Sequence, residues 1–188
     1  PNAVLFDWRK DINDPLNRNI ISKDDCSTLL QKSGINNDTI LVLYGDFNNW
    51  FAAFAFWVFE YYGMTNVKIM NGGRKKWLEE DRPISKDIPN FPMGNFKPSE
   101  PNPALRAFLN QVRESLNSDQ IKRIDVRSPP EFSGEITAPP EYPTEHAQRG
   151  GHIPGAVNIP WGKAVNDDGT FKSADELTKL YQTVGITP

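Results

Sequence analysis

The stretch that decides the fold is Pro1-Asn-Ala-Val-Leu-Phe-Asp-Trp-Arg-Lys-Asp-Ile-Asn-Asp14, because the chain repeats it. The later copy is Pro154-Gly-Ala-Val-Asn-Ile-Pro-Trp-Gly-Lys-Ala-Val-Asn-Asp167, and seven of the fourteen positions are identical at an offset of 153. Residues 22–35 match residues 173–186 at six of fourteen positions, at an offset of 151. A period of about 150 residues is the size of a domain and far exceeds a solenoid repeat. The sequence therefore predicts two copies of one domain.

Neither copy is expected to be complete within the 188 residues. Nothing before Pro1 corresponds to Gly150-Gly-His-Ile153 of the later copy, and the later copy stops at Pro188, whereas the first continues past Asn36. We therefore expect the back part of one domain, followed by the front part of a second.

The domain boundaries follow from a proline-rich segment. Residues 83–103 contain six prolines, a density that prevents both a helix and a central strand, so an extended linker is expected there. The first domain is then residues 1–82 and the second is residues 104–188. The residues on either side alternate short apolar runs with helical patterns.

That alternation predicts the α/β class, with short parallel sheets flanked by helices and ligand sites at the carboxyl ends of strands. Ser173 and Glu176 form a capping box at one helix start, and Ser22 begins the matching helix of the first copy. Residues 127–151 are expected to be a long polar loop. The expected strands are 39–44, 67–70 and 121–126, and the expected helices are 22–33, 50–62, 74–80, 104–116 and 173–184.

Composition narrows the classes of function. A net charge of −3 and a pI near 5.4, with the charges interspersed, give no reason to expect a nucleic acid or a membrane surface as partner. The longest apolar run, residues 50–59, is half the length that a membrane span needs. A single cysteine, Cys26, excludes an internal disulfide framework and suits a reducing cytosol, so a cytoplasmic location is expected.

Three strings carry a resemblance to a known family. They are Asn71-Gly-Gly-Arg-Lys-Lys-Trp77, Ile124-Asp-Val-Arg-Ser-Pro-Pro-Glu-Phe-Ser-Gly-Glu135 and Arg149-Gly-Gly-His-Ile-Pro-Gly-Ala-Val-Asn-Ile-Pro160. In this order, and together with the repeat, they resemble the rhodanese superfamily, and more narrowly its tandem-domain thiosulfate sulfurtransferases. The resemblance covers nearly the whole chain. It implies two rhodanese-like domains, both incomplete here.

The resemblance implies covalent chemistry at a cysteine. In that family the second domain carries the cysteine at the start of a six-residue loop between a strand and a helix, and its thiolate takes the outer sulfur of thiosulfate as a persulfide. Loop amides facing a helix start favour a thiolate and an oxyanionic donor. The offset of 151 places this nucleophile near position 196, about eight residues after Pro188, so no catalytic residue is expected in this chain.

The matching loop of the first copy has the right length and no cysteine. Gly45 stands at the nucleophile's position, or Asp46 if the register slips by one, so we expect an inactive loop. One of Asp46, Asn48 or Asn49 is expected to cap the following helix. The residues of this loop are Gly45, Asp46, Phe47, Asn48, Asn49 and Trp50.

Five other residues invite a functional role. Cys26 falls inside a helix and is expected to be a core thiol. Asp125 and Arg127 lie at the end of the second domain's first strand, where they form either an ion pair that braces the backbone or, through Arg127, a substrate-binding contact to an anion. Glu131 is the second substrate-binding candidate, although some family members supply a cation near its position. His152 is expected to be a hydrogen-bonded structural histidine, since a lone histidine provides no metal site.

The function implied by the resemblance is transfer of sulfane sulfur from thiosulfate to a thiophilic acceptor such as cyanide. The expected partners are a small-molecule donor and acceptor, including a small thiol or a thioredoxin-like acceptor, and no cofactor or metal is expected. Two alternatives stay open. They are a 3-mercaptopyruvate sulfurtransferase, which would differ in the loop near position 196, and a non-catalytic rhodanese-like interaction module.

Overall fold

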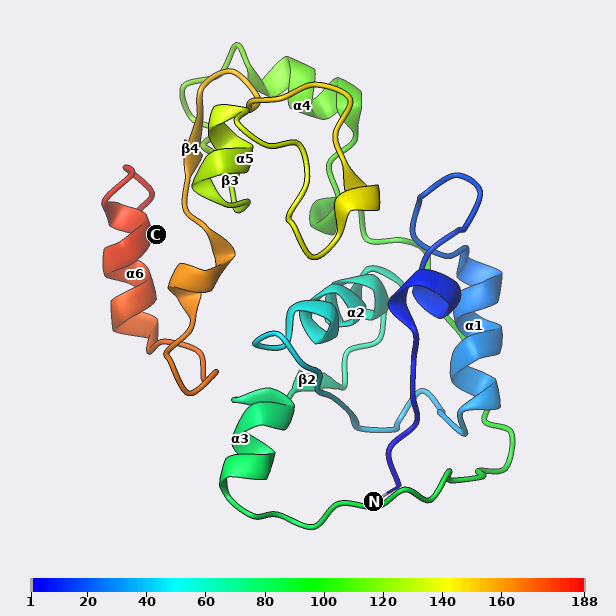
Figure 1. The fold of residues 1–188 in the computed structure, drawn as a ribbon. Coiled ribbons are helices and arrows are strands. Elements are labelled where there is room, and N and C mark those ends of the chain that lie inside the picture. The colour runs from blue at the N-terminus through cyan, green and yellow to red at the C-terminus, as the bar shows by residue number, and fades with distance from the viewer. Residues whose placement is uncertain (1, 188) are drawn as a thin grey trace. The chain divides into compact units, whose positions relative to one another are not determined.

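The computed structural model describes residues 2–187 and divides into two compact units, residues 1–107 and 108–188 (Figure 1). Each unit holds one two-stranded parallel sheet with helices around it. The α/β class predicted from the alternation of strands and helices is therefore confirmed.

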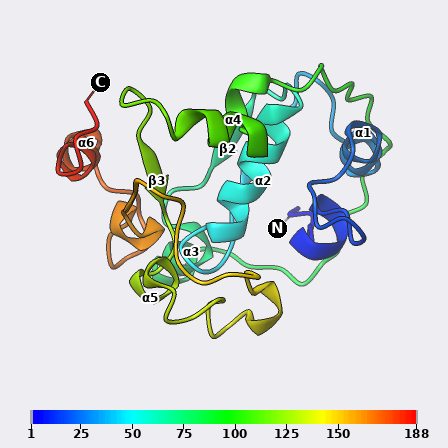
Figure 2. The ribbon, with the colours of Figure 1, turned by 90° about the horizontal axis from the view of Figure 1, so that it is seen from above.

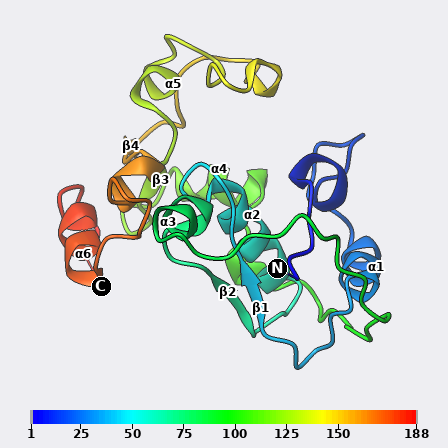
Figure 3. The same cartoon turned by 60° about the horizontal axis from the view of Figure 1, so that its bottom comes forward.

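The first unit is built around a strand, helix, strand sequence. Leu41 lies opposite Val67 in the parallel pair, and the connecting helix α2 packs against both strands (Figures 2 and 3). The elements of this unit are η1 (Trp8–Ile12), α1 (Lys23–Lys32), β1 (Leu41–Leu43), α2 (Trp50–Tyr61), β2 (Val67–Ile69), α3 (Gly73–Glu79) and η2 (Pro103–Leu105).

Helix α2 supplies much of the core of the first unit. Val58 and Phe59 are completely buried, and Cys26 and Leu30 of α1 are buried in the same cluster. Glu60 is the one charged residue of α2, so nearly every face of the helix must be covered by other segments. Burying a large apolar side chain contributes about 1.5–3 kcal/mol, which makes this packing the main stabilising term.

Strand β1 is covered on one face. A nearly continuous apolar run such as residues 39–44 is typical of a strand covered on both faces, but Ile40, Val42 and Tyr44 are exposed in the structure. Leu43 is buried. The reason is that α2 packs on this small sheet and covers one side of the strand.

Residues 83–102 contain no helix or strand, as the proline density predicts, and part of this segment packs on the first unit. Phe96 is 1% exposed and belongs to the core of that unit. The backbone amides of Gly94 and Phe96 donate to the carbonyls of Gln31 and Ile35, at 2.8 and 3.1 Å.

The second unit pairs β3 with β4 in parallel, with Ile124 opposite Val157. This unit has a smaller buried interior than the first, because Ile159 is its one buried apolar side chain among the residues described. Its elements are α4 (Leu109–Ser115), β3 (Arg123–Asp125), α5 (Pro129–Ser133), η3 (Pro143–Glu145), β4 (Ala156–Asn158), η4 (Trp161–Ala164) and α6 (Ala174–Gln182).

Two predicted elements of this part of the chain need correction. The helix expected over 104–116 is interrupted, since Arg106 and Phe108 are extended and α4 begins at Leu109. The Leu105 carbonyl accepts a hydrogen bond from Trp57 Nε1 of the first unit. In one continuous helix this carbonyl would instead accept the amide of the residue four positions later. The stretch 127–151 is not all loop, because a serine followed three residues later by a glutamate starts the short helix α5 there.

The repeat is visible in the structure as the same order of local elements. A helical turn starts at Trp8 in one copy and at Trp161 in the other. Isolated antiparallel bridges follow, Asn13 with Ile20 and Val165 with Phe171. Each copy then continues into a serine-capped helix, α1 or α6. The two copies thus share their local fold where both are present.

The burial of the paired helices differs. Cys26 is completely buried in α1, as predicted, whereas its partner Leu177 in α6 is only partly buried. None of the residues described for α6 is fully buried. Matched positions of the two copies therefore differ in burial.

Replacing Gly94 tests the packing of the proline-rich segment. A Cβ at this position would lie 2.2 Å from the carbonyl oxygen of Ile35, so Gly94→Ala must push the backbone away. We expect a loss of about 1–3 kcal/mol in the free energy of unfolding, measured by urea denaturation of the first unit. Gly45→Ala is the control, because its Cβ meets its nearest neighbours at 3.8 Å. Equal stability of the two variants would contradict this packing.

Candidate functional site

The loop between β1 and α2 lies at the carboxyl end of a parallel strand, where α/β proteins place their ligand sites. It curls directly into the start of α2. Phe47, Asn48 and Asn49 all adopt left-handed backbone conformations, with φ of 51°, 54° and 63°. Such conformations are costly outside glycine and persist where surrounding contacts enforce them.

Asn49 provides these contacts. Its side chain is completely buried, its Oδ1 accepts the Gly45 amide at 2.9 Å, and its Nδ2 donates to the Met70 carbonyl at 2.8 Å. Gly73 packs so closely that a Cβ there would lie 2.6 Å from Asn49 Oδ1. Asn49 occupies the N-cap position of α2 but its side chain makes no capping bond, so the expected capping role is wrong for it.

The outer side of the loop is held by an ion pair. Asp46 Oδ1 lies 3.0 Å from Arg74 Nη1, and the Arg74 amide donates to the Gly45 carbonyl at 3.1 Å. Asp46 therefore contacts α3 rather than the start of α2. Both ends of the loop are consequently fixed to the segment that follows β2.

Position 45 itself has room for a side chain. A Cβ built on Gly45 would meet the Cβ and the amide nitrogen of Ala52 at 3.8 Å, which is ordinary van der Waals contact. Ala52 lies in the first turn of α2, whose amides point toward the loop. A side chain at position 45 would thus extend next to the positive end of the helix dipole.

Cys26, the single thiol of the chain, lies in a different environment from position 45. It is completely buried in α1, and burial raises the pKa of its thiol to about 12. The thiolate is the nucleophilic form, and burial in apolar surroundings suppresses it. The structure confirms that Cys26 is a core thiol.

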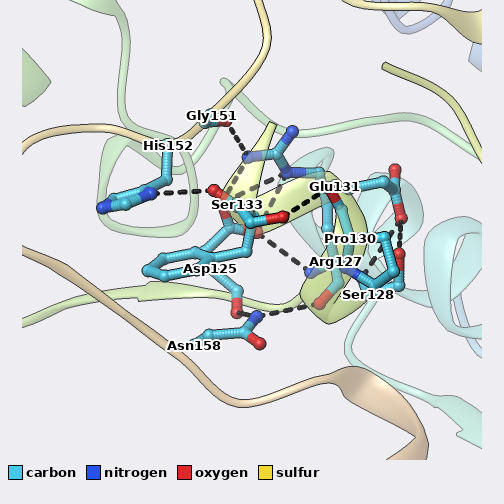
Figure 4. A network of polar contacts seen from close by, with 10 residues as sticks. Asp125, Arg127, Ser128, Pro130, Glu131, Ser133, Gly151, His152 and Asn158 are labelled. Atoms are coloured by element: carbon cyan, nitrogen blue, oxygen red, sulfur yellow. Dashed lines mark hydrogen bonds and ion pairs between the residues drawn. The ribbon is translucent and has the colours of Figure 1, made fainter. Parts of the chain in front are cut away.

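The second candidate region lies at the carboxyl end of β3 (Figure 4). Arg127 Nε and Nη2 donate to the Asp125 carboxylate, at 3.0 and 2.5 Å to Oδ1 and Oδ2, and the Arg127 amide adds a third bond at 3.0 Å. Arg127 Nη2 also donates to the Gly151 carbonyl at 2.7 Å. The expected ion pair is present, and it ties the strand end to the turn before β4.

The pairing with Arg127 lowers the pKa of the Asp125 carboxyl group. The Arg127 guanidinium, hydrogen-bonded to the carboxylate, holds the pKa of Asp125 below its ordinary value. The Asp125 side chain is 12% exposed and that of Arg127 is 33% exposed. The ion pair is therefore partly shielded from water, unlike most surface pairs.

Glu131 is also engaged within the protein. Its Oε2 accepts the Ser128 hydroxyl at 2.7 Å and the Ser128 amide at 3.1 Å, and the residue is 8% exposed. Glu131 thereby fixes the first turn of α5. The structure brings Arg127 and Glu131 to the same strand end, each bonded to a near neighbour in sequence.

His152 lies in the same region and contacts Phe132. Its Nδ1 donates to the Phe132 carbonyl at 2.8 Å, because a carbonyl can only accept, and its ring stacks on that of Phe132 at 3.7 Å. The expectation of a hydrogen-bonded structural histidine is confirmed. A cluster of three or more metal-ligating side chains does not occur among residues 2–187.

One residue of this network was not singled out from the sequence. Asn158 Nδ2 donates to the carbonyls of both Asp125 and Arg127, each at 2.9 Å, so the end of β4 fixes the end of β3. The sequence feature that could have identified it is a polar residue at the end of an otherwise apolar strand.

Within the part of the chain that the structure describes, no helix has the length and apolar character to cross a membrane.

Comparison with known proteins shows the family. The rhodanese-like domain pattern matches residues 1–80 and again residues 108–184. Both halves of the chain are covered, in agreement with the internal repeat and the two parallel sheets. The chain belongs to the rhodanese-like family, as two rhodanese-like segments in tandem.

Two curated relatives are similar along the whole chain. "Sulfur carrier protein TtuD" of Thermus thermophilus is 50% identical over an alignment of 190 positions, which covers 100% of this chain and 67% of the relative. "Putative thiosulfate sulfurtransferase 1" of Mycobacterium bovis is 48% identical over 184 residues, which are 98% of this chain and 66% of the relative. The chain thus spans about two thirds of the length of these relatives.

Solved structures show the same fold. The crystal structure of SseA from Escherichia coli, described with the catalytic mechanism of 3-mercaptopyruvate sulfotransferases, is 27% identical with a TM-score of 0.84. The match covers 100% of this chain and 68% of that one. The wild-type structure of EanB is 25% identical with a TM-score of 0.83, and the match covers 48% of that chain.

Thiol chemistry distinguishes the open position 45 from the buried position 26. In native protein at pH 8 we expect no reaction of Cys26 with the thiol reagent DTNB within an hour, because its thiol is inaccessible and protonated. A Gly45→Cys variant should release one equivalent of the coloured product, at least about 100-fold faster. Rapid reaction of the unaltered chain would contradict the burial, and a silent variant would contradict the open loop.

The Asp125 ion pair makes the second unit sensitive to acid. Because the folded-state pKa is lowered, the pair stabilises the protein above the unfolded-state pKa of about 3.9, and this contribution is lost as the pH falls through the folded-state value. We expect Asp125→Asn to cost about 1–2 kcal/mol at pH 7 and much less near pH 2. Urea unfolding followed through Trp161 measures this. Glu141→Gln, at an exposed carboxylate of the same unit, is the control, and an equal loss at both pH values would refute the pairing.

Proposed function

We propose that this chain is part of a thiosulfate sulfurtransferase that passes sulfane sulfur to a thiophilic acceptor through a cysteine persulfide. The observation that carries the proposal is the 48% identity, over 98% of this chain, to a relative named for that activity. The nucleophile is proposed to lie near position 196, outside the 188 residues, by the repeat offset of 151 from Gly45.

The arrangement of the first unit supports this placement. Its loop at residues 45–50 lies between a parallel strand and a helix start, and Gly45 stands where the thiol would be attached. We propose that this is the inactive loop and that its counterpart in the second unit carries the cysteine. The high pKa and complete burial of Cys26 support a nucleophile elsewhere.

The proposed reaction has two steps. The cysteine thiolate attacks the outer sulfur of thiosulfate, a new S–S bond forms, and the S–S bond of thiosulfate breaks so that sulfite leaves with the electron pair. The acceptor, for example cyanide, then attacks the outer persulfide sulfur and leaves as thiocyanate, which restores the thiolate. Amides at a helix start favour both the thiolate and the anionic donor.

Arg127 and Glu131 are proposed to serve this site at the carboxyl end of β3. Asp125 accepts from Nε and Nη2 of Arg127, and the Gly151 carbonyl also accepts from Nη2, so the orientation of the guanidinium is set before any anion binds. Glu131 is committed to Ser128, which suits support of the turn better than direct contact with an anionic donor. Arg127 is thus the anion-contact candidate of the two.

A second candidate donor, 3-mercaptopyruvate, is supported by the similarity to SseA, but at 27% identity against 48%. The relative named as a sulfur carrier protein makes a protein acceptor, such as a thioredoxin-like one, a natural candidate beside small thiols. We also propose a cytoplasmic location, since the chain carries a single, unpaired cysteine.

An assay of thiocyanate formation tests the proposal. The 188-residue chain should form no thiocyanate from thiosulfate and cyanide, whereas a chain extended through position 196 should be active. Cys26→Ser in the extended chain should leave turnover within a few-fold, and removal of the later thiol should abolish it, because covalent transfer has no substitute nucleophile. Activity of the short chain that disappears with Cys26→Ser would overturn the assignment. An extended chain active on 3-mercaptopyruvate alone would favour the second donor.

A further inference from the structure

The proline-rich segment has the composition of a linker, yet its second half is bound along the first unit. In Figure 1 it is the extended green trace that follows α3 and returns beside α1. We call residues 94–106 the strap. We propose that the strap is a fixed part of the first unit and that the joint between the two rhodanese-like units is confined to Ala107 and Phe108.

The strap begins with a buried anchor. Phe96 is 1% exposed, and its carbonyl accepts two side-chain hydrogen bonds from α1, from Gln31 Nε2 at 2.8 Å and Ser27 Oγ at 3.2 Å. The Phe96 amide donates to the carbonyl of Ile35. A residue held by its ring, its amide and its carbonyl cannot belong to a freely moving linker.

The middle of the strap closes the end of α2. The amides of Ser99 and Asn102 donate to the carbonyls of Tyr62 and Tyr61, both at 2.9 Å. These carbonyls lie at the C-terminal end of a helix, where no amide of the same helix can reach them. The strap therefore satisfies groups that a detached segment would leave to water.

The end of the strap is bound by aromatic side chains of α2. Trp57 Nε1 donates to the Leu105 carbonyl at 2.6 Å. The Arg106 guanidinium lies 5.9 Å from the ring centres of both Trp57 and Tyr61, within the range of a cation–π contact, and donates to Asn19 Oδ1 at 2.5 Å. Arg106 is thus bound to the first unit by three groups.

The second unit starts two residues later. The Phe108 amide donates to Gln111 Oε1 at 2.8 Å, so Phe108 is already part of the N-terminus of α4. A flexible segment of 21 residues would have a root-mean-square span of about 25 Å, whereas two residues reach about 7 Å. The proposed joint therefore contains a few rotatable backbone torsions in place of a flexible 21-residue segment.

Two matched insertions in the 188-residue chain test this joint. Four residues, Gly-Ser-Gly-Ser, inserted between Ala107 and Phe108 should shorten the rotational correlation time of the second unit, measured by ¹⁵N relaxation, by at least a quarter. The same insertion between Ile88 and Pro89, before the strap, should leave it unchanged, because the strap isolates that site from the joint. Equal effects of the two insertions, or no effect of either, would overturn the proposal.

Amide hydrogen exchange tests the strap directly. The amides of Phe96, Ser99 and Asn102 should be protected as strongly as those of α2, and Arg106→Ala should speed exchange at Asn102 and Leu105 by about tenfold while Phe96 changes little. Lys86→Ala, at an exposed residue before the strap, is the control and should change none of these rates. Unprotected amides across 94–106 in the unaltered chain would contradict a fixed strap.

Discussion

The first unit depends on covering α2. This helix carries one charge, Glu60, in twelve residues, so it cannot leave a broad face in water. Strands β1 and β2, the turn at η1 and the end of the strap at η2 all pack against it. Its C-terminal carbonyls are bonded by strap amides, and its N-terminus receives the loop held by Asn49. The unit is thus organised by one apolar helix, and its candidate site is the loop that enters that helix.

The second unit is held together differently. Its strand end is a network of polar groups in which Arg127 joins Asp125 to Gly151 and Asn158 joins β4 to β3. Such networks are specific in geometry and strong where partly shielded, but they respond to pH, unlike an apolar core. The proposed anionic donor would be bound by charged groups and amides rather than by apolar surface, and the end of β3 carries such groups.

Local features could be predicted from the sequence, and features set by distant contacts could not. The helix caps at Ser22 and Ser173 depend on residues three positions away, so they could be predicted from the sequence. The break before α4 depends on Trp57 holding the Leu105 carbonyl, 48 residues along the chain. The role of Asn49 likewise requires Met70, which is 21 residues away. The loop was located through the family resemblance, but the contacts that support it follow from the three-dimensional structure alone.

We propose that the sulfur-carrying thiol belongs to the second rhodanese-like unit and that Cys26 is inert. Peptide mapping by mass spectrometry tests it most directly, on a chain extended through position 196 and treated with thiosulfate before alkylation. We predict the added mass of one sulfur atom on the peptide that contains the later thiol, with no sulfur added to Cys26. Sulfur bound to the Cys26 peptide, or no added sulfur on either peptide, would contradict it.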